Sequence, residues 1–301
     1  MKLVFDIYKK YFMHHLKIFI ELTRLSKPIG FMLLFWPCSW GLAYAFYFDQ
    51  NLKKFLLFLI LFFLGSVLMR SAGCIFNDIV DKNLDKKVKR TKNRPIASGK
   101  ISVRLSLFYV VILCLIAFII LLQFNKLTIF LGLGSMLLAF SYPFMKRITY
   151  WPQLFLGLTF NWGIIMAWSS IMGNISINIG ILYISAIFWT LGYDTIYGTQ
   201  DLVDDEIIGN KSTSIKFKNI PFTFLIICYS VFLISIIITG ITLKSNYIFY
   251  MYLTLLVYHL FFRQISKLRI KVKENCLKIF KSNNEIGLII FISIIIGKVF
   301  N

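Results

Sequence analysis

Nine long apolar runs restrict the folds open to this sequence. A helix needs roughly 20 apolar residues to cross a bilayer. Lipid offers no partners for unpaired backbone groups, so such runs are expected to be helical. The chain is 58% hydrophobic and 15% charged, and we predict an all-α transmembrane protein. The runs cover about residues 28–48, 55–76, 104–123, 127–145, 152–172, 178–198, 221–242, 246–262 and 286–300.

Lys and Arg are unevenly shared between the two sides of the predicted bundle. With a cytoplasmic N-terminus, 27 of the 33 basic residues lie on the cytoplasmic side and 5 on the other. Such a bias follows the positive-inside rule. The net charge of +20 therefore indicates membrane orientation, and we expect a lipid bilayer but no nucleic acid as a partner. We expect residues 1–301 to form a single integral-membrane domain.

The cysteines and the N-terminus bear on compartment. The five cysteines are scattered without a C-x-x-C pair, so neither a disulfide framework nor a thiolate metal site is indicated. The first apolar run begins too late and is too long for a cleaved signal peptide, and no transit segment is recognisable. We therefore expect a multi-pass protein of a bacterial inner (plasma) membrane.

Acidic residues are concentrated in two short windows that follow apolar runs. The first window contains Asn77, Asp78, Asp81 and Asp85, which would share one face of a continuing helix. Carboxylates stacked in this way repel one another, and a cation between them removes the repulsion. Oxygen ligands alone suit a hard cation, above all Mg²⁺.

The second window, residues 194–206, holds five of the thirteen acids. It also emerges on the predicted cytoplasmic side. A solvated acidic helix end would explain either window alone, but two windows on one side favour a metal site. The predicted metal ligands are Asn77, Asp78, Asp81, Asp85, Asp201, Asp204 and Asp205, and the predicted catalytic acids are Asp78, Asp81, Asp201 and Asp205.

Two facing acid clusters could hold a diphosphate through Mg²⁺ and neutralise its charge as it departs. Basic side chains near the windows could bind the phosphate oxygens directly, since guanidinium groups match their geometry. Membrane orientation and lipid headgroups explain some of these charges equally well. The predicted diphosphate-binding residues are Arg90, Arg94, Lys146, Arg147 and Lys211.

Both acidic windows resemble the motifs of the UbiA prenyltransferases. The first match is Asn77-Asp78-x-x-Asp81-x-x-x-Asp85 with residues 88–95, and the second covers residues 194–213. The segments at 24–30 and 142–153 resemble the branch that uses 4-hydroxybenzoate. The resemblance implies nine helices around a central cavity. It also implies Mg²⁺-dependent transfer of a polyprenyl group from polyprenyl diphosphate to the 4-hydroxybenzoate ring, ortho to the hydroxyl, in ubiquinone biosynthesis.

Arg70 is a charged residue inside the second apolar run. Such a residue is costly in a membrane and usually faces a cavity. It precedes Asn77 by two helical turns, about 10 Å deeper at 1.5 Å per residue. The resemblance implies that Arg70 binds the acceptor carboxylate, although snorkelling or a distant salt bridge would also explain it. The predicted acceptor-binding residues are Arg70, Asp194 and Tyr197.

Two alternatives remain open at this point. The same chemistry could act on another aromatic acceptor, such as a dihydroxynaphthoate. A cation-coupled transporter could also carry acids in its spans, but transporter carboxylates tend to lie near the bilayer midplane. Here the acids lie at helix ends among Arg and Lys, which suits phosphate better. The apolar walls expected around a prenyl tail do not indicate its length.

Overall fold

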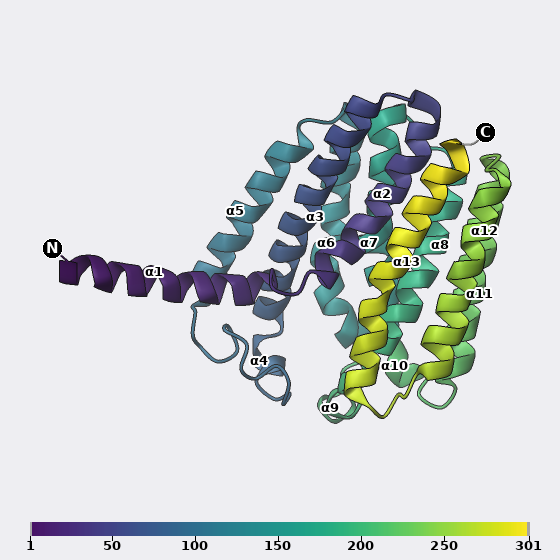
Figure 1. The fold of residues 1–301 in the computed structure, drawn as a ribbon. Coiled ribbons are helices and arrows are strands. Elements are labelled where there is room, and N and C mark those ends of the chain that lie inside the picture. The colour runs from purple at the N-terminus through teal and green to yellow at the C-terminus, as the bar shows by residue number, and fades with distance from the viewer. Residues whose placement is uncertain (1, 300–301) are drawn as a thin grey trace.

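The computed structural model describes the backbone of residues 2–299, with the side chains of Lys9 and of residues 13–297. Within this part the chain is helical and contains no strand. Nine of the described helical segments are long and apolar enough to cross a membrane. They stand side by side as a bundle, from which α1 (Lys2–Thr23) projects at one end (Figure 1).

The bundle helices are joined mostly by short loops. They are α2 (Ile29–Asp49), α3 (Leu52–Val80), α5 (Val103–Leu121), α6 (Lys126–Ile148), α7 (Pro152–Met172), α8 (Ile177–Gly198), α11 (Pro221–Thr242), α12 (Tyr247–Val257) and α13 (Lys273–Val299). A π-helical turn (Tyr258–Gln264) and a 3₁₀ turn (Ile265–Lys267) extend α12. The short helices α4 (Lys82–Asp85), α9 (Leu202–Ile208) and α10 (Thr213–Lys216) cluster at one end of the bundle (Figure 1).

The prediction of nine spans is confirmed for the described residues, but the start of the last span is wrong. Helix α13 begins at Lys273, well before residue 286. Its early turns are polar, and two asparagines there accept indole hydrogen bonds inside the bundle. Trp189 Nε1 donates to Asn283 Oδ1 at 2.9 Å, and Trp36 Nε1 donates to Asn284 Oδ1 at 2.9 Å. These bonds satisfy the amides, which a hydropathy average treats as unfavourable.

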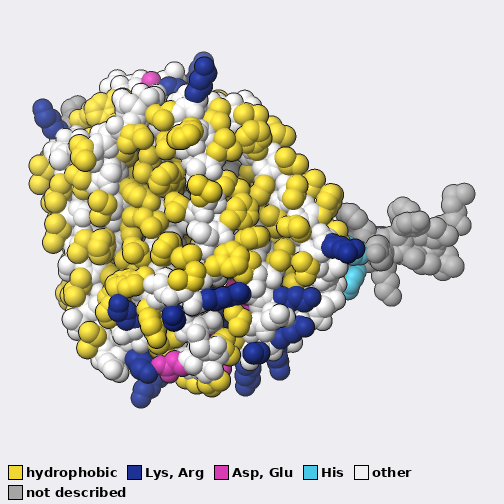
Figure 2. All heavy atoms as spheres, turned by 180° about the vertical axis from the view of Figure 1, so that it is seen from behind, with side chains coloured by type: hydrophobic (Ala, Val, Ile, Leu, Met, Phe, Trp, Pro, Cys, Tyr) yellow, Lys and Arg dark blue, Asp and Glu magenta, His cyan; other side chains and the backbone are white. Residues whose placement is uncertain are grey.

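Close backbone contact joins the central helices α2 and α7. A Cβ atom at Gly41 of α2 would lie 2.4 Å from the backbone oxygen of Ile164 on α7, so only glycine permits this approach. Trp40 and Trp189 fill the neighbouring core with ring centroids 5.1 Å apart. By contrast, the outer surface is rich in exposed apolar side chains, as expected of a surface that faces lipid (Figure 2).

Basic side chains gather toward one end of the molecule on the face shown in Figure 2. This is the end that carries α4, α9 and α10 (Figure 1). The arrangement matches the uneven loop charges of the sequence. A cytoplasmic N-terminus stays a prediction, because the structure contains no bilayer.

Helix α1 leads the chain into this charged end. Ile18 and Leu22 are buried against apolar residues of α3 and α5. After Thr23 the chain turns at Arg24, whose φ of 58° lies in the left-handed region. Such backbone strain in a non-glycine residue persists only where the surrounding structure holds it. Here the turn points the Arg24 side chain toward the end of α3.

Candidate active site

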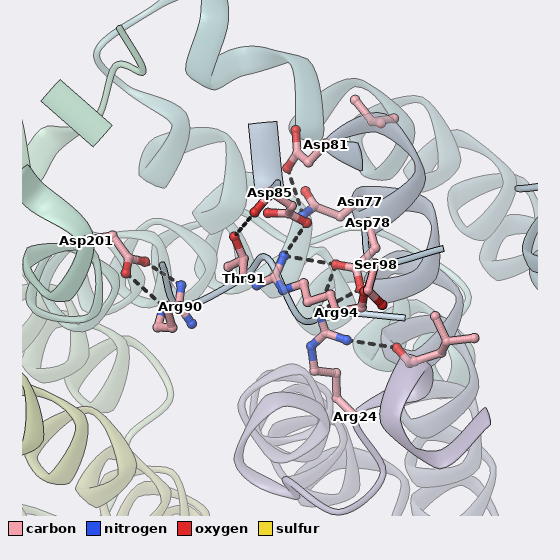
Figure 3. Close-up of polar contacts among 12 residues, drawn as sticks. Arg24, Asn77, Asp78, Asp81, Asp85, Arg90, Thr91, Arg94, Ser98 and Asp201 are labelled. Atoms are coloured by element: carbon pink, nitrogen blue, oxygen red, sulfur yellow. Dashed lines mark hydrogen bonds and ion pairs between the residues drawn. The ribbon is translucent and has the colours of Figure 1, made fainter. Parts of the chain in front are cut away.

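Asp78 is a buried carboxylate in the last turns of α3, held by two arginines (Figure 3). Arg24 Nη2 donates to its two oxygens at 2.8 and 2.9 Å. Arg94 Nη1 donates to Asp78 Oδ1 at 3.0 Å and to Asp85 Oδ2 at 2.9 Å. Burial disfavours the charge on Arg24, but the neighbouring Asp78 carboxylate outweighs burial and raises the pKa of Arg24. Arg94 thus joins Asp78 and Asp85 of the first window, and Arg24 binds Asp78 as well.

Asp81 stands where α3 ends, and its side chain is 1% exposed. Lys146 and Arg147, at the end of α6, both form ion pairs with it, Arg147 at 3.4 Å. Asn77 Nδ2 also donates to Asp81 Oδ2 at 3.1 Å. The first window is therefore linked to α6 by charge.

The prediction that one continuous helix carries the first window is wrong in detail. Helix α3 ends at Val80 and the single-turn helix α4 follows. The backbone N–H of Asp81 still donates to Asn77 O at 2.9 Å, and that of Asp85 to Asp81 O at 2.8 Å. Because these bonds keep a four-residue spacing across the break, Asn77 still contacts Asp81, while Arg94 bridges Asp78 and Asp85 (Figure 3).

Asp201 lies in the 3₁₀ turn (Thr199–Asp201) that follows α8, and it binds Arg90 (Figure 3). Arg90 Nε donates to Asp201 Oδ1 at 2.8 Å, and Arg90 Nη2 binds the other carboxylate oxygen. Arg90 Nη1 donates to the Tyr197 hydroxyl at 3.2 Å. Burial disfavours the charge on Arg90, but its hydrogen bonds to Asp201 outweigh burial and raise its pKa. The loop after the first window is therefore tied to the second window.

The remaining acids of the second window are less tightly held. Asp205, on α9, accepts a hydrogen bond from Asn210 Nδ2 at 2.8 Å and has Asp201, Lys146 and Arg90 as electrostatic neighbours. Asp204 is half-buried and forms no hydrogen bond or ion pair with the described side chains. Lys146 therefore lies between Asp81 of the first window and Asp205 of the second.

Four of the five predicted diphosphate-binding residues contact acids of the two windows. They are Arg90, Arg94, Lys146 and Arg147. The fifth, Lys211, does not. Its Nζ donates to the backbone oxygen of Ile148 at 3.2 Å and lies 5.7 Å from the ring centroid of Tyr150. Its side chain is therefore turned toward the end of α6.

The donor chemistry of this end fits Mg²⁺, since the side chains offer carboxylate and amide oxygens. No three acids, histidines or cysteines of the described chain converge closely enough to form a metal cluster on their own. The reason is visible in the contacts: Asp78, Asp81, Asp85 and Asp201 each face a basic side chain. Metal ligation by these acids would therefore require them to exchange basic partners for the metal.

Arg70 lies deeper in α3 and differs from the arginines above. It is half-buried, and its guanidinium carbon lies 5.2 Å from the centroid of the Phe160 ring. Its Nε atom is buried without a hydrogen-bond partner, and Arg70 forms no ion pair with any side chain that the structure describes. Asp194 and Tyr142 are its electrostatic neighbours. Of the three predicted acceptor-binding residues, Arg70 and Asp194 are thus electrostatic neighbours, whereas Tyr197 contacts Arg90.

Two residues of the site were missed by the sequence reasoning. Arg24 binds Asp78 from a distance of 54 positions in the chain. Tyr142 has Arg70, Asp81 and Asp194 as electrostatic neighbours. Both lie in the segments that resemble family motifs, 24–30 and 142–153, and this resemblance could have identified them as residues of the site.

Comparisons with known proteins agree with this geometry. The UbiA prenyltransferase family matches residues 34–295. A bovine protein named "4-hydroxybenzoate polyprenyltransferase, mitochondrial" is 43% identical over 284 residues, covering 94% of this chain and 76% of that protein. A "4-hydroxybenzoate octaprenyltransferase" of Photobacterium profundum is 39% identical over 281 residues, covering 93% of this chain and 96% of that protein. The structure of a UbiA homologue from Archaeoglobus fulgidus bound to GPP and Mg²⁺ shares the fold, with a TM-score of 0.70 at 16% identity over 92% of this chain and 99% of that one.

The comparisons overturn the predicted bacterial inner-membrane location. Similar relatives from cattle, human and Arabidopsis thaliana are named as mitochondrial proteins, although a bacterial relative also matches. Apolar spans and basic loops meet the demands of any bilayer, so they could not identify the membrane. What the spans do support is a multi-pass membrane protein.

Proposed function

This chain belongs to the UbiA prenyltransferase family, and on that premise we propose that it transfers a polyprenyl group to 4-hydroxybenzoate. The donor is polyprenyl diphosphate, the new carbon–carbon bond forms ortho to the ring hydroxyl, and diphosphate and the displaced ring proton are released, as a step of ubiquinone biosynthesis. The observation that carries the proposal is the pairing of both acid windows with basic side chains at one end of the bundle, above an arginine that lacks an ionic partner among the described side chains.

The donor binds at the charged end. Mg²⁺, when bound, neutralises the diphosphate and its growing charge as the prenyl group departs. The ligands would be Asn77, Asp78, Asp81, Asp85, Asp201, Asp204 and Asp205, each of which would bind the metal through a carboxylate or amide oxygen. Arg90, Arg94, Lys146 and Arg147 leave their carboxylate partners and donate to phosphate oxygens. Lys211 joins them only if its side chain turns away from Ile148.

This exchange of partners explains why so many opposite charges occupy one end of a membrane protein. With no substrate, each buried acid keeps a basic partner, which avoids the cost of an unpaired buried charge. When metal and diphosphate enter together, they bring both signs of charge. Acids and bases can then change partners without leaving either group unpaired.

The acceptor binds beside Arg70. Its unpaired guanidinium binds the carboxylate of 4-hydroxybenzoate, and Asp194 lies near enough to balance that charge before the acceptor arrives. Tyr197 lies beside the donor site, since its hydroxyl accepts a hydrogen bond from Arg90, and the centroid of its ring lies 4.5 Å from that of Phe280. Its ring face could stabilise positive charge on the departing prenyl carbon. The apolar bundle keeps water away from that carbon.

The test is an assay of the purified protein in detergent, without a membrane gradient. Polyprenyl diphosphates of several lengths and a panel of aromatic acids are supplied with Mg²⁺, and products are identified by mass spectrometry. We expect prenylated 4-hydroxybenzoate. If product forms only from a dihydroxynaphthoate, the chain is still a prenyltransferase of this family, but its acceptor is not 4-hydroxybenzoate. No product in detergent, together with gradient-driven uptake in vesicles, would support a transporter instead.

A further inference from the structure

We propose that Gly30 is a positioning residue for Arg70, and that through Arg70 it makes the acceptor site selective for acids. The inference rests on the proposed function. Gly30 lies in the first turn of α2, opposite Arg70 on α3. A Cβ atom at Gly30 would lie 2.8 Å from Arg70 Nε, 3.5 Å from Nη2 and 3.6 Å from Cζ. Contacts under 3.0 Å are essentially absent for real Cβ atoms, so only glycine admits this position of the guanidinium.

Few other contacts fix the Arg70 guanidinium. Arg24, Arg90 and Arg94 are each held by at least one carboxylate. Among the described residues, Arg70 lies against the Phe160 ring and has Asp194 and Tyr142 as electrostatic neighbours, but it forms no ion pair, and its Nε is buried without a hydrogen-bond partner. A side chain with so few polar contacts takes the position that packing allows. The space left by the missing Cβ of Gly30 therefore decides where the charge lies.

The same contact creates a preference for an anion. Gly30 belongs to the first turn of a 21-residue helix, whose N-terminus carries partial positive charge. Two positive groups thus lie side by side, and the neighbouring Asp194 carboxylate is not within ion-pair distance of Arg70. An anionic ligand beside them would be stabilised by both groups and would accept hydrogen bonds from the Arg70 guanidinium. A planar aromatic acid is the ligand class that fits an arginine lying over a phenyl ring.

A methyl group at Gly30 should disturb recognition far more than folding. The overlapping atoms belong to a flexible side chain, which can move aside, whereas several other glycines of the bundle face backbone or rings. Alanine is also a better helix former than glycine. We therefore expect Gly30→Ala to keep the fold and displace the guanidinium.

The experiment is a double-mutant cycle on the full-length protein in detergent with Gly30→Ala, Arg70→Leu and the double variant. Gly65→Ala is the matched control, because a Cβ there meets nothing within 4 Å although Gly65 lies on the same helix as Arg70. Equilibrium binding of 4-hydroxybenzoate is measured without donor, and apparent constants for both substrates are measured in turnover. Thermal unfolding reports on the fold.

Gly30→Ala should weaken 4-hydroxybenzoate binding at least about tenfold, the scale of one lost charge-assisted hydrogen bond. The constant for prenyl diphosphate should change less than about twofold. The double variant should bind the acid no more weakly than Arg70→Leu, because residues that act through one contact are not additive. Gly65→Ala should match the wild type.

The proposal would be overturned if Gly30→Ala bound 4-hydroxybenzoate as tightly as the wild type. It would also be overturned if the losses of affinity from the two single substitutions added fully in the double variant. An equal loss for both substrates would point to a general packing role and also overturn it. If the wild type instead prenylates a different aromatic acid, the proposed function is wrong, and the same cycle on that acid decides the role of Gly30. If it accepts only uncharged phenols, both proposals fail.

Discussion

The Arg90 guanidinium binds both carboxylate oxygens of Asp201, a residue 111 positions further along the chain. This ion pair joins the loop after the first acid window to the turn that contains the second (Figure 3). Arg90 is 39% exposed and Asp201 is 13% exposed, so the pair can be reached from the aqueous side. Partly exposed pairs are weakly stabilising, which suits an interaction that must open when substrate binds.

Arg90→Gln is therefore expected to weaken donor binding and leave acceptor binding nearly unchanged. Loss of charge-assisted hydrogen bonds to phosphate should raise the apparent constant for prenyl diphosphate about tenfold or more. Titration of each substrate at saturating levels of the other measures both constants. Arg104→Gln is the matched control, since Arg104 is an exposed arginine at the start of α5. Equal effects of the two substitutions would contradict a donor role for Arg90.

Removal of divalent metal should abolish turnover. The acids at the charged end offer only oxygen ligands, and diphosphate departure without a metal would leave its charge poorly neutralised. Product formation is measured in excess chelator and again after Mg²⁺ or Mn²⁺ is restored. We expect complete loss and full recovery. Undiminished turnover in chelator would exclude the metal role of these acids.

The sequence predicted the fold better than the contacts within the site. Long apolar runs identified all nine spans of the described residues, although not the start of the last, because a bilayer demands a minimum length of apolar helix. The acid windows could be recognised because like charges at helical spacing need a cation nearby. Arg70 could be recognised for a similar reason, since a charge within a span is costly. In each case the physical constraint acts on local sequence.

Contacts between distant residues could not be predicted in the same way. The sequence suggested that acids face a metal, whereas the structure pairs Asp78 with Arg24 and Asp81 with Lys146. Those partners lie 54 and 65 positions away, and only the packed bundle brings them together. The start of α13 was missed because the hydrogen bond from Trp189 to Asn283 makes a polar residue acceptable inside the bundle.

Gly41→Ala should destabilise the protein, because its methyl group would meet backbone instead of a flexible side chain. The built Cβ lies 2.4 Å from Ile164 O, so α2 and α7 would have to separate. Overpacking of this kind costs about 1–3 kcal/mol. Gly73→Ala is the control, since Gly73 is exposed on α3 and a Cβ there meets nothing within 4 Å. Thermal unfolding in detergent should show a lower Tm for Gly41→Ala alone; equal values would refute this packing argument.

The acids of the two windows allow a sharper test of charge against structure. From the sequence, removing Asp81 should relieve repulsion between like charges. The structure changes that expectation, because Asp81 is held by Lys146 and Arg147. Alanine would therefore leave two cations without their partner. Asparagine is the better probe, since it keeps the shape and a hydrogen-bond acceptor while removing the charge.

Asp81→Asn and Asp201→Asn are each expected to lower turnover at least about 100-fold, the scale lost with a key electrostatic stabiliser. Asp49→Asn is the matched control, because Asp49 also pairs with a lysine, Lys54 at 3.5 Å, but lies on α2 at the opposite end from the two windows. The control should keep near wild-type turnover, and a retained cooperative unfolding transition in each variant shows that the loss of turnover is not a loss of fold. Single-turnover rates at saturating substrate separate chemistry from binding. Near-normal rates in Asp81→Asn and Asp201→Asn would show that the charges serve only to pair the basic residues, and the two-window site would then be wrong.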